Sequence, residues 1–171
     1  MKKQGFTLIE LMVVIVIMGI LAAVAVPKLF GMIAKSKASE VGPAAGTYVK
    51  LQQAYISEAV AVGNWQIIGY KGPGEQGTGA STTGGATSNT TNFAYSDGGT
   101  YVNNTTALAS GTKVKGFAVQ NNLKLNDCTS AADNWKVEVE KSSASEGDAT
   151  FTATVASACT DLTPNFNKIG Q

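Results

Sequence analysis

The sequence predicts an α+β protein in which a long N-terminal helix packs against a C-terminal antiparallel β-sheet. Residues 6–62 show first an apolar stretch and then an amphipathic repeat, and both patterns favour helix. Residues 113–156 contain segments in which apolar and polar side chains alternate, which is typical of strands with one buried face. The chain beyond the helix is long enough for one small domain. We therefore expect a single α+β head carried on a long helix.

The apolar stretch Phe6–Val26 reads FTLIELMVVIVIMGILAAVAV, and Glu10 is its only charged residue. As a helix with a rise of about 1.5 Å per residue, it is long enough to cross the hydrocarbon core of a bilayer. Lysines in residues 1–5 (MKKQG) favour the cytoplasm for that end, so the rest of the chain is expected to face outward. No cleavage site of the ordinary secretory type follows the stretch. Because a carboxylate within a membrane span is costly, Glu10 needs a partner.

The composition argues against several classes of site. The chain has 13 Lys+Arg residues against 12 Asp+Glu residues, and it has no His. This near-neutral balance gives no sign of specific nucleic-acid binding. Without His there are no His-based triads and no His metal ligands, and the acidic residues lack the spacing of an EF-hand calcium loop. We therefore expect no catalytic residues, no metal and no cofactor.

The two cysteines, Cys128 and Cys159, both lie downstream of the apolar stretch. In an exported domain they are expected to form a disulfide, whereas in a cytosolic protein they would be reduced core thiols. The predicted membrane anchor favours the disulfide, which would bound the region 128–159.

The N-terminal residues 1–30 resemble the class III signal of type IV prepilins and of the related type II secretion pseudopilins. The matching features are a Lys-rich leader and then, in order, Gly5, Phe6, Glu10, Gly19 and Pro27. The resemblance implies that residues 1–5 are a leader, which a prepilin peptidase removes by cutting between Gly5 and Phe6. The same enzyme would methylate the new Phe6 amine. The resemblance further implies that subunits polymerise through helix 6–27 into a filament.

The charge of Glu10 has a physical reason in such a filament. Cleavage creates an α-amino group at Phe6, which is largely protonated near neutral pH. Glu10 lies four residues further on and would share that amine's face of the helix. Because a shift of register would leave an unpaired charge in an apolar bundle, we expect Glu10 to set the assembly register. The alternative is that Glu10 merely reaches the lipid headgroups at the cytoplasmic end of the span.

Two residues weaken the second half of the membrane helix. Gly19 lowers helix propensity, and Pro27 cannot donate to the backbone hydrogen-bond ladder. Filaments of the resembled family commonly have an extended segment around such a glycine and proline. We therefore expect the helix to kink or open between Gly19 and Pro27.

A second, amphipathic helix is predicted over residues 28–62, where apolar or small residues recur at steps of three or four. Gly42 and Pro43 interrupt it and predict a second bend. Gly63 and Asn64 predict its C-terminal end. The apolar face of this helix would cover the head.

The head is expected to comprise residues 63–171. Residues 65–70 (WQIIGY) favour a short strand. Residues 71–111 are rich in Gly, Ser, Thr and Asn and predict a long surface loop with one short strand near residues 93–95.

Three strands are predicted in the tail, at residues 113–120, 134–140 and 150–156, with a polar hairpin loop at 141–148 between the last two. They would form an antiparallel sheet with one apolar face. Disulfide-bounded loops around such a sheet are frequent in the pilins that the N-terminus resembles, which agrees with the pairing expected for the cysteines.

The first functional hypothesis is a structural subunit of a type IV pilus used in adhesion, twitching motility or DNA uptake. Its partners would be further copies of itself, the prepilin peptidase and an inner-membrane assembly platform driven by an ATPase. The subunit would cross the inner membrane once, with its head outside the cytoplasm, and would then enter an extracellular filament.

Two alternatives remain at this point. The first is a pseudopilin of a type II secretion system, which the cysteine pair and the long polar loop disfavour. The second is a membrane-tethered enzyme or binding module. No nucleophile–base pair, metal cluster or phosphate-binding loop supports it, and it leaves Glu10 unexplained.

Overall fold

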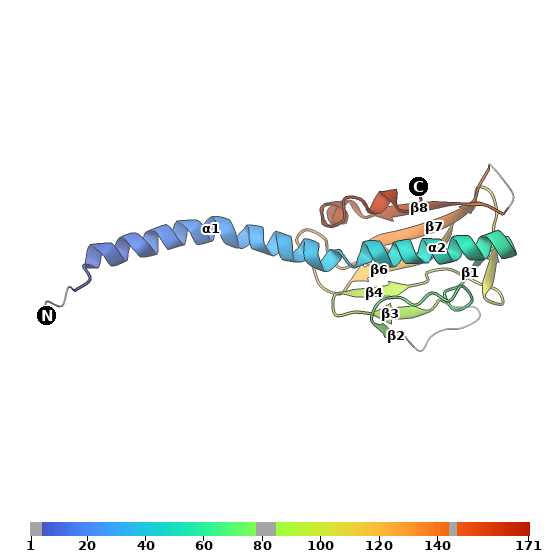
Figure 1. The fold of residues 1–171 in the computed structure, drawn as a ribbon, viewed down its shortest axis with the longest axis horizontal. Coiled ribbons are helices and arrows are strands. Elements are labelled where there is room, and N and C mark those ends of the chain that lie inside the picture. The colour runs from blue at the N-terminus through green and yellow to red at the C-terminus, as the bar shows by residue number, and fades with distance from the viewer. Residues whose placement is uncertain (1–4, 78–84, 144–146) are drawn as a thin grey trace.

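The computed structural model describes residues 5–77, 85–143 and 147–171. Figure 1 shows a long helix, α1, that projects from a head in which a second helix, α2, lies across a sheet. The predicted α+β fold is confirmed. The elements in chain order are α1 (Leu8–Ala38), α2 (Val41–Ala59), β1 (Ala61–Gly63), β2 (Glu75–Gln76), β3 (Thr87–Asn89), β4 (Phe93–Ser96), β5 (Thr105–Ala107), β6 (Val114–Asn121), β7 (Trp135–Lys141), β8 (Ala149–Val155), and the 3₁₀ helices η1 (Ser157–Leu162) and η2 (Phe166–Lys168).

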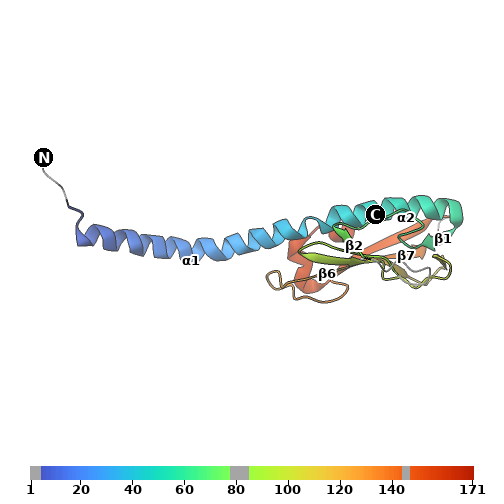
Figure 2. The same cartoon turned by 90° about the horizontal axis from the view of Figure 1, so that it is seen from below.

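Helix α1 stands almost entirely outside the head, as Figures 1 and 2 show. Only Ala34 and Ala38, near its C-terminal end, are buried. The helix runs without interruption through Gly19 and Pro27, with a gentle curve. The opening between these two residues concerns the assembled filament and stays a prediction. Together, α1 and α2 form the one stretch among the described residues that is long and apolar enough to cross a membrane.

A bend is predicted at Gly42 and Pro43. The structure instead interrupts the helix slightly earlier, at Ser39 and Glu40, which separate α1 from α2. Pro43 accounts for this position, because it has no N–H to donate to the Ser39 carbonyl and its ring crowds that same group. Pro43 itself sits in the first turn of α2, where a backbone N–H has no intrahelical acceptor in any case. Glu40 keeps right-handed helical angles (φ −73°, ψ −26°), so α2 continues close to the direction of α1.

Helix α2 ends at Ala59 and not at residue 62, so Gly63 and Asn64 do not end it as predicted. Val60 adopts a left-handed conformation (φ 51°), which is strained for a β-branched residue. The chain accepts this turn because Ala61–Gly63 pairs as β1 with β5. The Asn64 N–H then donates to the Asn104 carbonyl over 2.8 Å, which extends the pairing.

The main sheet has six antiparallel strands in the order β2-β3-β4-β6-β7-β8. Its β6, β7 and β8 are the three strands predicted in the tail, each within a residue of the expected bounds. Trp135, Val137 and Val139 of β7 are fully buried, as their alternation predicts. The predicted hairpin loop joins β7 to β8, and residues 144–146 of it lie outside the described part of the chain.

Two predictions for the first part of the head are wrong. Residues 65–70 form consecutive turns and no strand, because the Tyr70 N–H donates to the Trp65 carbonyl (2.9 Å) and Gly69 takes a positive φ of 70°. Residues 71–111 are also more ordered than a loop, since they contain β2, β3 and β5 as well as β4. These strands are held by backbone pairing, which needs no apolar side chains. Residues 78–84 lie outside the described part.

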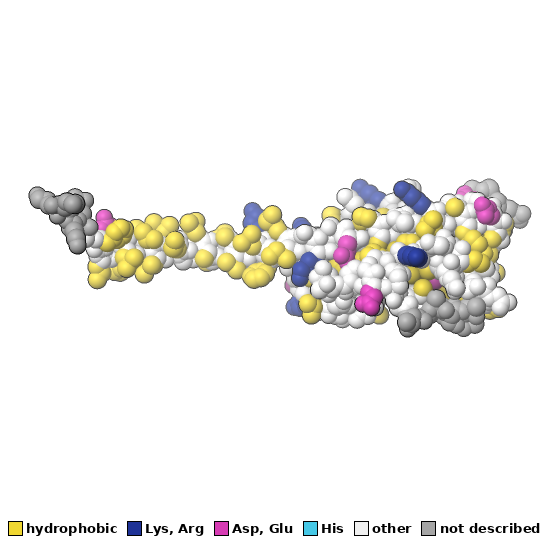
Figure 3. Space-filling view, turned by 60° about the horizontal axis from the view of Figure 1, so that its bottom comes forward, with side chains coloured by type: hydrophobic (Ala, Val, Ile, Leu, Met, Phe, Trp, Pro, Cys, Tyr) yellow, Lys and Arg dark blue, Asp and Glu magenta, His cyan; other side chains and the backbone are white. Residues whose placement is uncertain are grey.

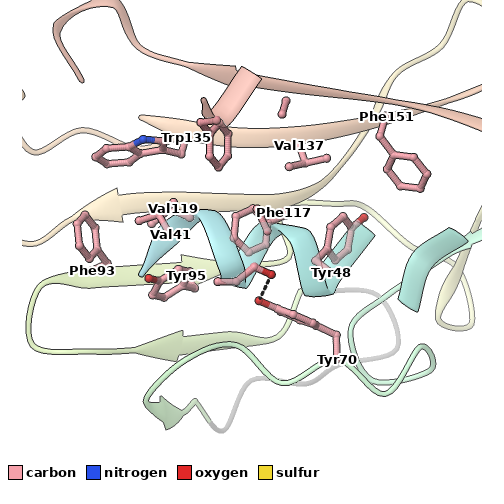
Figure 4. Packing of buried hydrophobic residues seen from close by; sticks show 14 of the residues in the cluster. Val41, Tyr48, Tyr70, Phe93, Tyr95, Phe117, Val119, Trp135, Val137 and Phe151 are labelled. Atoms are coloured by element: carbon pink, nitrogen blue, oxygen red, sulfur yellow. Dashed lines mark hydrogen bonds between the residues drawn. The ribbon is translucent and has the colours of Figure 1, made fainter. Parts of the chain in front are cut away.

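The core lies between α2 and the sheet and is dominated by aromatic rings (Figure 4). Tyr48 of α2 stacks on Phe117 of β6, with ring centroids 5.7 Å apart. The Tyr70 hydroxyl donates to the Ala44 carbonyl of α2 over 3.1 Å, which ties the turns after β1 to the helix. Gly116 lies where the β6–β7 register shifts, directly against the Tyr48 hydroxyl. The amphipathic helix thus covers the apolar face of the sheet, as expected.

Candidate functional site

The predicted cleavage junction lies ahead of α1 in irregular backbone. Gly5 and Phe6 are both exposed, and the Phe6 side chain has 80% of its surface accessible. A Cβ added at Gly5 would meet no described atom within 4 Å. Exposed, irregular backbone of this kind is what a peptidase needs at the bond it cuts. The geometry is therefore compatible with cleavage between these residues.

Glu10 forms a capping box with Thr7 at the start of α1. The Thr7 backbone N–H donates to Glu10 Oε2 over 2.8 Å, and the Thr7 hydroxyl donates to the same oxygen over 2.6 Å. In return, the Glu10 N–H approaches the Thr7 hydroxyl oxygen at 3.4 Å. The Thr-x-x-Glu spacing is the sequence signal for this motif, but our sequence reasoning missed it.

The capping box changes the expected relation between Phe6 and Glu10. Because Thr7 is the N-cap, α1 begins at Leu8 and Phe6 lies outside the helix. In the uncleaved chain the two residues therefore do not share a helical face. The Glu10 carboxylate is instead engaged by Thr7. A pairing of Glu10 with the Phe6 amine requires the processed chain and remains a prediction.

Large apolar side chains cover α1 on all sides. The first half of the helix is exposed throughout, from Leu8 to Gly19 and beyond. Ile9, Leu21 and Val24 have between 64% and 72% of their surface accessible. An exposed apolar surface this long marks a membrane or protein contact, because isolated soluble proteins rarely present one.

The predicted disulfide is present between Cys128 and Cys159, with the Cα atoms 4.7 Å apart. Both residues are buried. The bond joins the segment that follows β6 to the 3₁₀ helix η1 that follows β8, and it closes a sequence separation of 31 residues. It therefore ties the C-terminal segment, which packs beside the end of α1, to the sheet.

One buried carboxyl in the head was not singled out from the sequence. Asp97 accepts hydrogen bonds from the Trp65 N–H (2.7 Å) and from the Tyr101 hydroxyl. Burial raises the pKa of Asp97 to about 6, although these hydrogen bonds oppose the rise. The group anchors the turns after β1 to β4. Among the described residues it shares no cleft with a second candidate catalytic group, so we assign it a structural role.

No group of three or more His, Cys, Asp or Glu side chains is arranged to hold a metal ion in residues 5–77, 85–143 and 147–171. The functional features that the structure does bring together lie at the N-terminus: the exposed junction, the capped Glu10 and the apolar helix.

A family match lies in this same segment. Residues 1–26 match the family described as the prokaryotic N-terminal methylation motif. The type IV major pilin protein PilA of Myxococcus xanthus is 44% identical over 57 residues, which is 33% of this chain and 26% of that protein. The type IV major fimbrial protein FimA of Dichelobacter nodosus is 56% identical over 39 residues, covering 23% of this chain and 25% of its own.

A further relative is the fimbrial protein EcpC of Eikenella corrodens, which is 54% identical over 44 residues, or 26% of this chain and 29% of its own. The matches thus span only about a quarter of the curated relatives. No solved structure matches the chain significantly. Residues 1–26 of this chain therefore match the prokaryotic N-terminal methylation motif, and part of the chain is similar to part of the type IV major pilins.

Proposed function

We propose that this protein is the structural subunit of a type IV pilus. The observation that carries the proposal is an exposed apolar helix, α1, that includes most of the methylation motif and joins a folded, disulfide-bonded head. The head supplies no grouping of catalytic side chains in its described part. The subunit acts through polymerisation and not through chemistry of its own.

The apolar surface of α1 must be covered at every stage. Figure 3 shows hydrophobic side chains over the visible face of α1 and a mostly polar head. Before assembly the inner membrane covers the helix, with the head outside the cytoplasm. In the filament, the same helices of neighbouring subunits cover one another. Glu10 sets the register of that packing, and Gly19 and Pro27 allow the helix to open there.

Processing precedes assembly in this scheme. A prepilin peptidase cuts between Gly5 and Phe6 and methylates the Phe6 amine. An inner-membrane platform driven by an ATPase then adds the subunit to the filament, which is used in adhesion, motility or DNA uptake. We favour a pilus over a secretion pseudopilus because the similar proteins are named pilins and fimbrial proteins.

Mass spectrometry of sheared surface fibres tests this function. We expect electron microscopy to show filaments, and we expect their subunit to begin at a Phe6 that carries one methyl group on its amine. Subunits that retain residues 1–5, or fibres that do not contain this chain, would contradict the proposal.

The variant Gly5→Val tests the processing step. A Cβ at this position meets no described atom within 4 Å, so the fold is expected to be unchanged. We expect the uncleaved chain to accumulate in the membrane without filaments. Gly46→Ala, at an equally open position in α2, is expected to leave processing and assembly intact.

A further inference from the structure

Lysine side chains gather where α1 enters the head, as Figure 3 shows on both sides of the helix. Lys28, Lys35 and Lys37 follow the apolar stretch on α1, and Lys124 comes from the segment after β6. Lys37 is half-buried and the other three are exposed. The ion pairs of the described residues join Lys115 to Asp133 and Lys136 to Glu138, so none of them neutralises this group.

Two of these lysines line a pocket of about 200 Å³ between α1 and the segment after β6. Its lining combines apolar side chains with the two ammonium groups and one amide. The lining residues are Phe30, Ile33, Ala34, Lys37, Lys124, Leu125 and Asn126. The pocket thus combines an apolar lining with two lysines.

Little negative charge opposes these lysines nearby. Asp127 follows Asn126 on the same segment and is exposed. Glu40 lies at the start of α2, but its carboxylate accepts hydrogen bonds from the Thr90 hydroxyl (2.7 Å) and the Tyr95 hydroxyl (2.9 Å). The four lysines therefore outnumber these two acidic residues near the pocket. This excess of positive charge favours an anionic ligand.

The pocket lies at headgroup depth when α1 spans a membrane. Exposed apolar side chains continue past Pro27 to Phe30 and Ile33, so the apolar surface of α1 reaches the pocket. Lys37 lies one helical turn beyond Ile33, or about 6 Å along the axis.

The orientation of the chain supplies an independent argument. Positive charge on the outer flank of a span works against the bias that Lys2 and Lys3 create on the other side. Lys28, Lys35 and Lys37 therefore do not serve orientation. Attraction to anionic headgroups is worth roughly a fivefold gain in affinity per lysine near a membrane surface. Such attraction would explain why these lysines lie at this end of the apolar stretch.

We propose that this pocket binds an anionic phospholipid of the membrane that α1 spans. Lys37 and Lys124 face the lipid phosphate, and an acyl chain runs along Phe30 and Ile33. The proposal rests on the membrane-held stage of the proposed function. The bound lipid holds the head against the membrane until assembly removes it.

Native mass spectrometry of the full chain from nanodiscs tests the lipid site. The nanodiscs contain equal amounts of phosphatidylglycerol and phosphatidylcholine, and the count of each lipid retained by the subunit is compared. We expect the unaltered chain to retain phosphatidylglycerol preferentially. The double variant K37Q/K124Q is expected to bind this lipid roughly 10- to 30-fold more weakly, because two headgroup-level charges are lost.

The double variant K50Q/K71Q removes the same charge from exposed lysines elsewhere on the head and is expected to keep the preference. Equal retention of the two lipids by the unaltered chain would overturn the proposal. So would an equal loss in both double variants, since that would reflect net charge alone. Trp fluorescence verifies that each variant has a folded head. Filament formation is scored separately, so a chain that forms no filaments but selects phosphatidylglycerol refutes the pilus and not the lipid site.

Discussion

Helix α1 exposes its large apolar side chains, whereas the head buries its aromatic side chains between α2 and the sheet. Ile9 of α1 has 69% of its surface accessible, while Trp65, Trp135 and Tyr48 of the head have none. The head is therefore stable through contacts within one subunit. In the proposed function, α1 is instead covered by a membrane or by other subunits, and its sequence is constrained by those partners.

The same contrast appears in the comparisons with other proteins. The methylation motif lies within residues 1–26, and the similar pilins named above match between 23% and 33% of the chain. In the proposed function, α1 must pack against copies of itself and enter the assembly machinery, and few sequences satisfy both requirements. A head that must only fill its own core has many acceptable sequences, because cores tolerate exchange when volume and pattern are kept.

The largest expected effect breaks the function of α1 and leaves the head intact. Glu10→Ala removes the only charge of the apolar stretch, so we expect normal membrane insertion and complete loss of filaments. Electron microscopy of sheared fibres and membrane fractionation measure the two outcomes. Normal filaments would contradict the register role of Glu10.

Thr7→Ala provides the matched control for this variant. It removes the capping box but keeps the Glu10 carboxylate. Loss of a cap costs about 1 kcal/mol of helix stability, which is small for a helix held in a membrane or bundle. Filaments are therefore expected. If Thr7→Ala abolishes them as completely as Glu10→Ala does, the cap and not the charge pair is what assembly requires.

The next effect is confined to the head. Replacing Cys128 and Cys159 with Ser removes the disulfide, which joins residues 31 positions apart in the sequence. We expect the free energy of unfolding to fall. The chain-entropy argument gives a loss of about 3–4 kcal/mol. Both Trp residues lie in the head core, so Trp fluorescence in denaturant reports its unfolding alone. Unchanged stability would show that the bond adds nothing to the packing of η1.

Burial of Asp97 gives the stability of the head a pH dependence. Its pKa is raised to about 6 from 3.8, so the folded head binds this proton more tightly than the unfolded chain does. The free energy of unfolding should therefore fall as pH rises from about 4 to about 6, by up to about 3 kcal/mol from this group. Asp97→Asn should remove that part of the dependence. Parallel curves for the two proteins across this window would refute it.

The contrast between the two regions also explains which features can be predicted from sequence. Strand β7 alternates buried and exposed residues, and the apolar stretch of α1 is continuous, so each pattern indicates its structure directly. Strands β2 and β5 are polar and short, and nothing in their side chains distinguishes them from a loop. Their formation depends on strands elsewhere in the chain.

The remaining differences have a similar cause. Residues 65–70 resemble a strand, but the buried Trp65 donates its indole N–H to the Gly116 carbonyl over 2.8 Å, and turns follow. The pairing of β1 with β5 decides the end of α2 at Ala59, and that partner lies more than forty residues away. Burial of Asp97 likewise follows from the fold. Only the Thr7 capping box was readable from local spacing and was missed.

The smallest expected effect concerns the packing of Gly116 against Tyr48 in the head core. A Cβ at this position would lie 1.9 Å from the Tyr48 hydroxyl oxygen and 2.9 Å from its Cζ. Gly116→Ala must therefore displace Tyr48 from Phe117 or shift the carbonyl that accepts the Trp65 indole N–H. We expect a loss of about 1–3 kcal/mol in the free energy of unfolding. Gly46→Ala, with open space in α2, is the matched control and is expected to cost nothing.

Tyr48→Phe tests whether the clash with the Tyr48 hydroxyl is what destabilises Gly116→Ala. The substitution breaks no hydrogen bond, because the buried Tyr48 hydroxyl has no partner among the described residues. Removing it should be neutral or slightly stabilising. In the Tyr48→Phe background the nearer clash is gone and the contact with Cζ remains, so Gly116→Ala should cost less but still destabilise. The double-mutant cycle measures this coupling, which is expected to exceed about 0.5 kcal/mol for residues in contact. Additive effects would show that Gly116 is required by its backbone and not by the Tyr48 ring.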